Sequence, residues 1–344
     1  MNKMKKIDIF GRKNTKAVSS DSRQIRVLDG IPMLIACIVI VVALYVFGIT
    51  GVFNSNTQRY LLKIFLYCTL GSMWNLMSGY TGMTSLGQQT FIGLAGYSLT
   101  VMTATYAMSY WVGFLAGAVI SAIVSLILAI ILFRMRGMYF AVATWVIAEA
   151  LRTFFTSWKF VKQGAGMTVA ARPYPSTNTI YVIALTLCII ALVVIYFLLK
   201  SKVGLGLTAM RDDPDAASSV GVDIFKSKLL CFVICAIFTA LAGGIFYLNK
   251  GSIYPAGGFG ISWTVSIVFI VIIGGIGTMG GPVLGSILYV IFEEQLAKLP
   301  GGWTNIVLGI IAILVILFLP DGILGTLQKK LHFEILSQKR FSKE

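Results

Sequence analysis

Residues 112–133 read VGFLAGAVISAIVSLILAIILF, a run of apolar and small residues without one charged side chain. An α-helix needs about 20 such residues to cross the hydrocarbon core of a bilayer, because each residue advances it by only about 1.5 Å. The stretch therefore predicts a membrane-spanning helix. The composition agrees, since 57% of the 344 residues are hydrophobic and only 12% are charged. Water-soluble domains carry about twice that share of charged residues, so the sequence predicts a membrane protein.

Nine further apolar runs flank this stretch, which makes ten candidate spans. They predict an all-α, polytopic transmembrane helical bundle of about ten membrane-inserted helices, including some that are broken or re-entrant. The transmembrane domain then covers 31–319, between a basic N-terminal arm at 1–30 and a C-terminal tail at 320–344. The ten runs are 31–50, 61–77, 89–108, 112–133, 138–157, 180–199, 229–248, 262–279, 281–296 and 303–319.

The distribution of charge predicts the orientation in the membrane. The chain has 28 lysine and arginine residues against 13 acidic residues, a formal charge of +15. If the N-terminus is cytoplasmic and all ten runs cross, the inner segments hold 20 basic residues and the outer segments hold six. Cytoplasmic loops retain Lys and Arg during insertion, so both termini and the loop at 200–228 are expected to be cytoplasmic. The basic arm is better explained by contact with anionic lipid than by nucleic-acid binding.

Residue types disfavour several kinds of catalytic and cofactor site. All five cysteines lie in apolar runs, and the single histidine, His332, lies in the tail. This argues against a disulfide scaffold, a zinc site and histidine-based catalysis. The pattern G-x-x-x-x-G-K-[ST] does not occur in the sequence, so we expect no ATP binding through a phosphate-binding loop. We predict no metal site, no bound cofactor and no catalytic residue in this chain.

Two glycine-rich segments lie in opposite halves of the chain. They are GYTGMTSLGQQTFIGLAGYS at 79–98 and GGIGTMGGPVLG at 274–285. Glycine lets helix backbones approach closely, and it also lets a helix unwind where bare backbone is needed. Both interpretations stay open. The glycines that we single out for helix packing or gating are Gly79, Gly82, Gly87, Gly274, Gly275, Gly277 and Gly281.

The segment RDDPDAASSVG at 211–221 concentrates charge in the middle of an apolar chain. It predicts a short helix, since aspartates favour the positive end of the helix dipole and Pro214 suits the first turn. Alanines favour a helix that can seat closely against a partner, and Gly221 can end it with a left-handed backbone. A solvated loop is the plainer alternative. The residues in question are Arg211, Asp212, Asp213, Asp215, Ala216, Ala217 and Gly221.

Four ordered segments resemble the LivM-type permeases, which are membrane subunits of the branched-chain amino acid family of ATP-binding-cassette importers. The segments are 78–98, 133–158, 201–247 and 271–294, and the resemblance runs from about residue 60 to 320. Within the third segment, DAASSVG at 215–221 resembles the EAA loop of importer permeases. That resemblance implies that 211–221 is a cytoplasmic coupling helix, which sits in a groove of an ATPase subunit.

The resemblance also implies partners and a location. The chain would be a permease subunit in a bacterial or archaeal cell (inner) membrane, and not itself an enzyme. A second, LivH-like permease subunit, two ATPase subunits that bind ATP and Mg, and an extracytoplasmic substrate-binding protein would complete the importer. Branched-chain amino acids are the leading substrates. Gln88, Gln89 and Thr90 depart from the histidine and small residues usual in the family, which leaves urea or another amide, and nucleosides, as alternatives.

Polar residues inside the predicted spans are few, because a charge at mid-bilayer costs roughly 2.5–3.5 kcal/mol on insertion scales. Glu149 and Arg152 are three residues apart in the run 138–157, so a helix lets them pair. The pair either faces the bundle interior beside the translocation path or fastens helices together near the outer end. Asn75, Gln88 and Gln89 offer hydrogen bonds either to a passing solute or between helices.

A stand-alone secondary transporter or channel is the alternative from another class. It requires membrane carboxylates that couple an ion. Glu149 is the one good candidate, and Arg152 is its neighbour. A membrane-embedded enzyme is more remote, because the sequence offers no polar catalytic cluster.

Overall fold

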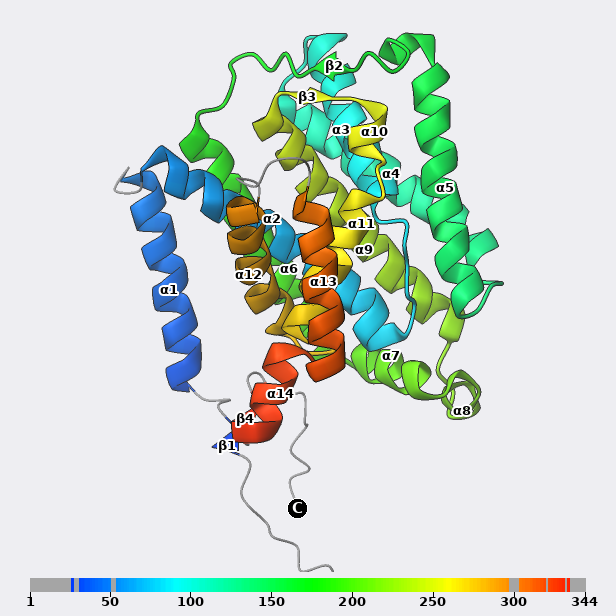
Figure 1. The fold of residues 1–344 in the computed structure, drawn as a ribbon. Coiled ribbons are helices and arrows are strands. Elements are labelled where there is room, and N and C mark those ends of the chain that lie inside the picture. The colour runs from blue at the N-terminus through cyan, green and yellow to red at the C-terminus, as the bar shows by residue number, and fades with distance from the viewer. Residues whose placement is uncertain are drawn as a thin grey trace, which may run out of the picture.

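The computed structural model describes residues 26–27, 31–50, 54–296, 303–319, 321–331 and 333–334, and these are almost entirely helical (Figure 1). A helix overlaps each of the ten apolar runs. These helices are α1 (Ile31–Ile49), α2 (Ser55–Asn75), α3 (Gln89–Ala104), α4 (Tyr110–Leu132), α5 (Met138–Ser157), α6 (Thr177–Lys200), α9 (Ile224–Lys250), α11 (Ser262–Gly274), α12 (Gly281–Leu296) and α13 (Trp303–Phe318).

Shorter elements connect the long helices. They are α7 (Lys202–Asp212), α8 (Pro214–Ser219), α10 (Pro255–Gly258), α14 (Gly322–Leu331), a π-helical turn at Leu76–Tyr80 and a 3-10 turn at Lys159–Val161. Strand β1 (Arg26–Val27) pairs in parallel with β4 (Phe333–Glu334), and β2 (Met167–Thr168) pairs antiparallel with β3 (Ser252–Ile253). In Figure 1, α7, α8 and α14 lie at one end of the molecule, and β2, β3 and α10 lie at the opposite end.

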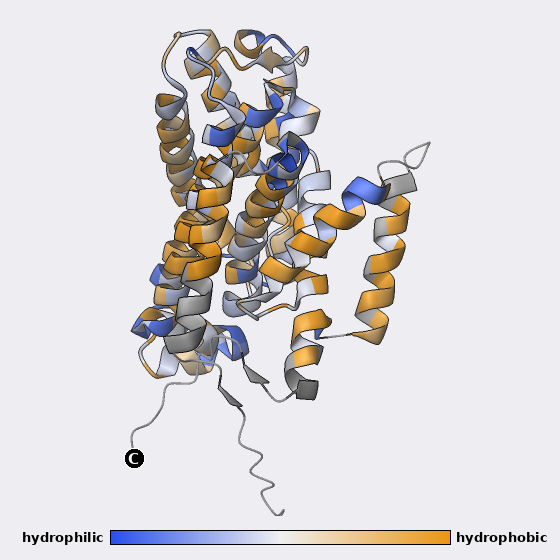
Figure 2. Ribbon diagram, turned by 90° about the vertical axis from the view of Figure 1, so that its left-hand side faces the viewer, coloured by the Kyte–Doolittle hydropathy of each residue, from blue (hydrophilic) through white to orange (hydrophobic). Residues whose placement is uncertain are grey.

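The surface identifies an all-α membrane protein. Among the described residues, five helical segments are long and apolar enough to cross a bilayer: Tyr110–Leu132, Met138–Ser157, Thr177–Lys200, Ile224–Lys250 and the stretch Pro255–Gly274, which comprises α10 and α11. Hydrophobic residues predominate along the helices in Figure 2. On α4, Leu115, Ile127 and Ile130 are exposed, and an apolar patch of this extent is typical of a surface that meets lipid or a partner. The count of ten crossings remains a prediction.

Small residues bring α3, α4 and α9 into close contact. A Cβ atom added at Gly117 of α4 would lie 3.0 Å from the Cα atom of Ala95 in α3. One added at Gly243 of α9 would lie 2.7 Å from the Cα atom of Ile92. Helices without a hydrophobic driving force between them associate through such close packing. The core therefore lies around α3, while α1 and α5 stand at the two flanks in Figure 1.

Both glycine-rich segments interrupt helical structure. Helix α2 passes into the π-helical turn, and residues 82–88, between two of the expected spans, are non-helical before α3 begins. The run 262–279 does not form one helix, because α11 ends at Gly274. Gly275 and Gly277 have φ values of +120° and +75°, which residues with side chains rarely adopt. The run 89–108 is likewise shorter as a helix, since α3 ends at Ala104.

Candidate functional site

The two glycine-rich segments meet in a cluster that we call the glycine junction: Asn75, Gly79, Gly277 and Thr278. Asn75, in the last turn of α2, donates from Nδ2 to the carbonyl of Thr278 at 2.9 Å. Its Oδ1 accepts from the backbone N–H of Gly277 at 2.8 Å. One side-chain amide thus satisfies two backbone polar groups of the unwound segment after α11, which would be costly to leave unpaired in a membrane.

The junction requires glycine. A Cβ atom at Gly79 would lie 2.6 Å from the backbone nitrogen of Gly277 and would overlap Oδ1 of Asn75. On the other side of the unwound segment, a Cβ at Gly274 would overlap the carbonyl of Gly281, and one at Gly281 would overlap the carbonyl of Gly275. Gly275 takes part through its positive φ. These glycines therefore serve close backbone approach and unwinding together.

Arg211 connects the charged segment to this junction. Its Nη1 donates to the carbonyl of Gly79 at 2.8 Å, and its Nε donates to Asp212 at 3.0 Å. Gly82, with φ +71°, packs beside Arg211. A charged donor forms a stronger hydrogen bond to a carbonyl than a neutral donor does. The end of α7 is thus attached to the π-helical turn that follows α2.

The charged segment forms two short helices rather than one. Asp212 is the last residue of α7, so it does not lie at the start of the next helix as expected. Asp213 caps α8, since its Oδ1 accepts from the backbone N–H groups of Asp215 and Ala216 at 2.9 and 3.0 Å. Pro214 occupies the first turn, and Gly221 follows with φ +88°. The cap and the left-handed glycine agree with the sequence pattern.

One of the two alanines of α8 does not face outward as expected. Ala217 is only 2% exposed and packs inside the chain, so it fastens α8 instead of facing a partner. Asp215 and Ala216 are exposed, and the side chain of Val220 is 79% exposed. We call Asp215, Ala216 and Val220 the docking face. Small side chains such as Ala216 let a partner approach the helix backbone closely.

A cavity of about 220 Å³ lies beside the charged segment. Its lining includes the basic residues Arg136, Arg211 and Lys228, together with Met210 and Pro214. Arg136 comes from the loop between α4 and α5, and Lys228 from the first turns of α9. Basic residues distant in sequence therefore gather at the α7–α8 end of the molecule.

Gln88 and Gln89 take no part in the hydrogen bonds described for the junction, and both are buried. Gln88 accepts from the hydroxyl of Thr239 in α9 at 3.0 Å. Gln89 donates to the carbonyl of Leu86 at 3.1 Å and contacts the hydroxyl of Thr264 in α11. Nearby, a Cβ at Gly87 would lie 2.9 Å from the Cβ atom of Thr144 and would overlap the Thr144 backbone. Their hydrogen bonds join the start of α3 to neighbouring helices.

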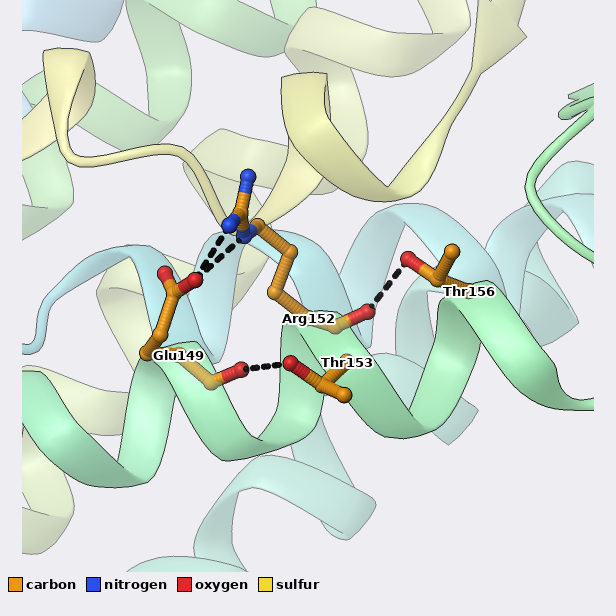
Figure 3. Close-up of polar contacts among 4 residues, drawn as sticks. All are labelled: Glu149, Arg152, Thr153 and Thr156. Carbon is orange, nitrogen blue, oxygen red and sulfur yellow. Dashed lines mark hydrogen bonds and ion pairs between the residues drawn. The ribbon is translucent and has the colours of Figure 1, made fainter.

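Glu149 and Arg152 form the expected ion pair on α5 (Figure 3). Arg152 donates from Nε to Oε1 of Glu149 at 2.9 Å and from Nη2 to the same oxygen. Each side chain is 42% exposed in this chain. The pair therefore does not face the interior of this chain's bundle, which α5 contacts through residues such as Phe140, Thr144 and Ala148.

Sequence reasoning missed a second ion pair. Lys63 of α2 pairs with Glu294 of α12, and its Nζ lies 3.8 Å from Oε2 of Glu293. The signal was present, since Lys63 is a lone cation within an apolar run and needs a compensating charge there. Its partners could not be assigned, because they lie about 230 positions away.

Comparisons with known proteins agree with this architecture. The family described as "Branched-chain amino acid transport system / permease component" matches residues 56–316. The chain is 24% identical to the high-affinity branched-chain amino acid transport system permease protein LivM of Escherichia coli K12, over 94% of this chain and 83% of that protein. It is 24% identical to LivM of Salmonella typhimurium over 78% of this chain and 70% of that protein.

A shorter match is to the probable permease protein LivH of Methanocaldococcus jannaschii, 31% identical over 42% of this chain and 47% of that protein. No solved structure matches the chain significantly. The family match covers every element from α2 to the last turns of α13, including the glycine junction, the charged segment and α5. The chain therefore belongs to the permease-component family of branched-chain amino acid transport systems and is LivM-like along most of its length.

Proposed function

We propose that the chain is the membrane-spanning permease subunit of an ATP-binding-cassette importer for branched-chain amino acids. ATP and Mg²⁺ act in two separate ATPase subunits, and a LivH-like second permease and an extracytoplasmic binding protein complete the importer. Family membership and the names of the LivM relatives support this. The single observation that carries the mechanism is the hydrogen bond from Arg211 to the carbonyl of Gly79.

The ATPase contact is assigned to the docking face. Asp215, Ala216 and Val220 are exposed, while Ala217 holds α8 against its own chain. Small and apolar residues on a short, capped helix let a partner approach closely and push on the helix as a unit. The basic residues that line the neighbouring cavity supply attraction for acidic groups on the partner.

A push on α8 then reaches the membrane-spanning part through Arg211. The arginine holds Gly79, and Gly79 lies against Asn75 and Gly277 in the glycine junction. Asn75 holds the unwound segment between α11 and α12 by two hydrogen bonds. Packed elements of this kind shift between discrete arrangements instead of deforming continuously, so displacement of α7 changes how α2 and α11 meet. This is the step that we assign to opening and closing of the path.

We further propose about ten membrane insertions, with both termini in the cytoplasm. The overlap of a helix with each of the ten apolar runs supports the count. Arg136, Arg211 and Lys228 line one cavity at the α7–α8 end, where α14 also lies (Figure 1). Basic residues retained on one side of a membrane are typical of the cytoplasmic side.

The proposal is tested by co-purification and transport. Val220→Arg and Ala216→Trp place bulk or charge on the docking face and should abolish co-purification of the ATPase subunits and leucine uptake into proteoliposomes. Ala104→Trp, at an exposed position at the end of α3, is the matched control and should change neither. Retained ATPase binding by both docking-face variants would contradict the assignment.

Other solutes and another mechanism make different predictions. A relative of 30% identity over 40% of this chain is named as an autoinducer 2 import permease, so relatives with a different named cargo exist. Urea, another amide or a nucleoside remains the alternative cargo for this chain. Competition for uptake by these solutes, and not by leucine, would favour that alternative. Uptake by the chain without ATPase subunits would favour a secondary transporter or channel instead.

A further inference from the structure

The outer face of α5 carries charge in a place where lipid would not tolerate it. Glu149 and Arg152 lie in the C-terminal half of a helix that is long and apolar enough to cross a bilayer, and each side chain is 42% exposed. A charge at the bilayer centre costs roughly 2.5–3.5 kcal/mol on insertion scales. Tyr254 and the start of α10 lie beside Arg152, and the rest of the pair is open to the surface. A face of this kind is expected to meet a polar path or a polar partner surface.

The pair leaves one atom of each charge available. Nε and Nη2 of Arg152 both contact the same oxygen of Glu149, Oε1. Oε2 of Glu149 and Nη1 of Arg152 make no hydrogen bond within the described part of the chain. Figure 3 shows the third guanidinium nitrogen pointing away from α5. The pair therefore presents a negatively charged acceptor and a positively charged donor side by side.

Two open pockets flank the pair. The first, of about 470 Å³, is lined by Trp145, Val146, Glu149, Ala150 and Thr153, so its wall is mainly apolar. The second, of about 350 Å³, includes Arg152, Thr153, Thr156, Ser157 and Tyr254 in its lining. Thr153 lines both pockets, which places them next to each other. Both are open depressions on the surface of this chain, and the first is lined by α5 alone.

The hydroxyl groups add acceptors to this face. Thr153 donates to the carbonyl of Glu149 at 3.0 Å, and Thr156 donates to the carbonyl of Arg152 at 2.7 Å (Figure 3). Each hydroxyl proton is thereby committed to the backbone, so the lone pairs of the two oxygens face outward as acceptors. Acceptors suit an ammonium group, which has three donors to satisfy.

We propose that residues 145–156 of α5 form one wall of the translocation path and contact the α-amino acid zwitterion directly. Nη1 of Arg152 binds the α-carboxylate, and Oε2 of Glu149 with the threonine hydroxyls binds the α-ammonium. The aliphatic side chain rests against Trp145 and Val146. This inference rests on the proposed function, because it needs an importer whose cargo is an amino acid, and it adds the residues that contact the cargo.

Charge complementarity selects this cargo. The pair presents one free donor atom and one free acceptor atom, so a ligand with only one charge leaves either Nη1 of Arg152 or Oε2 of Glu149 without a charged partner, which is less favourable in a site of low polarity. Urea and nucleosides carry no such pair of charges. The apolar pocket on one side and the hydroxyl-lined pocket on the other match the two ends of an aliphatic amino acid.

The test uses the complete importer, with both permeases, both ATPases and the binding protein, in proteoliposomes. Photo-leucine, a diazirine analogue of leucine, is transported under single-turnover conditions, irradiated, and its attachment sites are mapped by mass spectrometry. We expect attachment within residues 145–156, competed by excess leucine and at least about tenfold less by isoamylamine or isovalerate, each of which lacks one charge.

Variants separate contact from a structural role. Val146→Trp fills the apolar pocket while keeping both charged residues and should reduce attachment at least about tenfold, while Val142→Trp, exposed on the same helix but outside both pockets, should not. The exchange Glu149→Arg with Arg152→Glu keeps an ion pair, and so the fold, but reverses the charges. It should reduce attachment to a similar degree while ATP hydrolysis is kept.

Each remaining outcome overturns the inference. Attachment elsewhere, or attachment unchanged by Val146→Trp and by the charge exchange, shows that α5 is not the contact wall. Competition by phosphatidylethanolamine, and not by leucine, shows that the face is a lipid site. If the unaltered importer transports leucine and these results are found, only this inference fails. If it transports no leucine at all, the proposed function fails with it.

Discussion

Nη1 of Arg211 lies 2.8 Å from the carbonyl oxygen of Gly79, so a residue of the charged segment holds a residue 132 positions earlier in the chain. The first lies at the end of α7 and the second in the π-helical turn after α2. This contact is the direct connection between the proposed ATPase docking face and the glycine junction, and it defines the first prediction.

Arg211→Gln should uncouple transport from ATP hydrolysis. Glutamine cannot reach the carbonyl with a charged donor, and a hydrogen bond to a charged group contributes about 1.5–3 kcal/mol. Because the arginine is partly exposed, we expect the lower part of that range, or roughly a tenfold fall in leucine transported per ATP hydrolysed. Lys226→Gln, a change of charge at an exposed residue away from the junction, should leave the ratio unchanged. An equal loss in both variants would argue against a specific connection.

Gly277→Ala should destabilise the protein. Its φ of +75° is costly for a residue with a side chain, by roughly 1–2 kcal/mol. The measurement is the midpoint of thermal unfolding of the purified protein in detergent. Gly309→Ala is the control, because Gly309 lies in α13 and no atom lies within 4 Å of the added Cβ. Alanine there should be neutral or stabilising by up to about 1 kcal/mol. A lower unfolding midpoint for Gly309→Ala but not for Gly277→Ala would contradict this prediction.

Asp213→Ala should loosen α8 without unfolding the protein. The carboxylate accepts two backbone hydrogen bonds at the start of the helix, and loss of such a cap costs about 0.5–2 kcal/mol. Amide hydrogen exchange at 214–219 should become faster, and Asp213→Ser should restore much of the protection. Asp215→Ala serves as control, since the Asp215 side chain makes no such cap. Protection unchanged in Asp213→Ala would show that the cap does not hold the docking face.

Lys63→Met should destabilise the contact between α2 and α12. It leaves Glu293 and Glu294 without their cation, and because all three side chains are partly exposed we expect about 1–2 kcal/mol rather than the 3–5 of a fully buried pair. Lys63→Met combined with Glu294→Gln should recover part of the loss in a double-mutant cycle of unfolding free energies. Strictly additive losses would mean that the two charges do not interact.

The start of α9 should loosen at low pH. Hydrogen bonds from the backbone and side chain of Lys226 lower the pKa of Asp223, which caps this helix. A carboxyl whose pKa is lower in the folded state stabilises that state at pH values above the unfolded-state pKa. This contribution is lost as the pH falls through the lowered pKa. Amide exchange in the first turn, corrected for its intrinsic pH dependence, should therefore rise in acid. In Asp223→Ser, amide exchange in the first turn, corrected in the same way, should not rise in acid.

The sequence contains enough to place the helices but not their contacts. Each apolar run predicts a helix because bilayer thickness fixes its length, and the structure has a helix at each of the ten. Proline and glycine at 214 and 221 likewise predict the bounds of α8, because both act through the local backbone. The break at Gly274 was not placed, since glycine permits both packing and unwinding.

Long-range contacts could not be predicted because they depend on how helices pack. Asn75 in an apolar run signals a polar partner, yet its partners lie 202 and 203 positions away. Ala217 shows the same limit on a smaller scale. Its helix could be predicted, but the face on which it lies is set by contact with the rest of the chain.

The connection between α8 and α11 includes main-chain atoms of Gly79 and Gly277. Main-chain atoms in such a packed contact are rigid. The Arg211 side chain has several rotatable bonds and is the flexible part of the same connection. The freedom of movement between α8 and the membrane helices therefore depends mainly on this one side chain. A shorter or longer side chain at position 211 would change how far the ATPase subunits must displace α8 before the membrane helices respond.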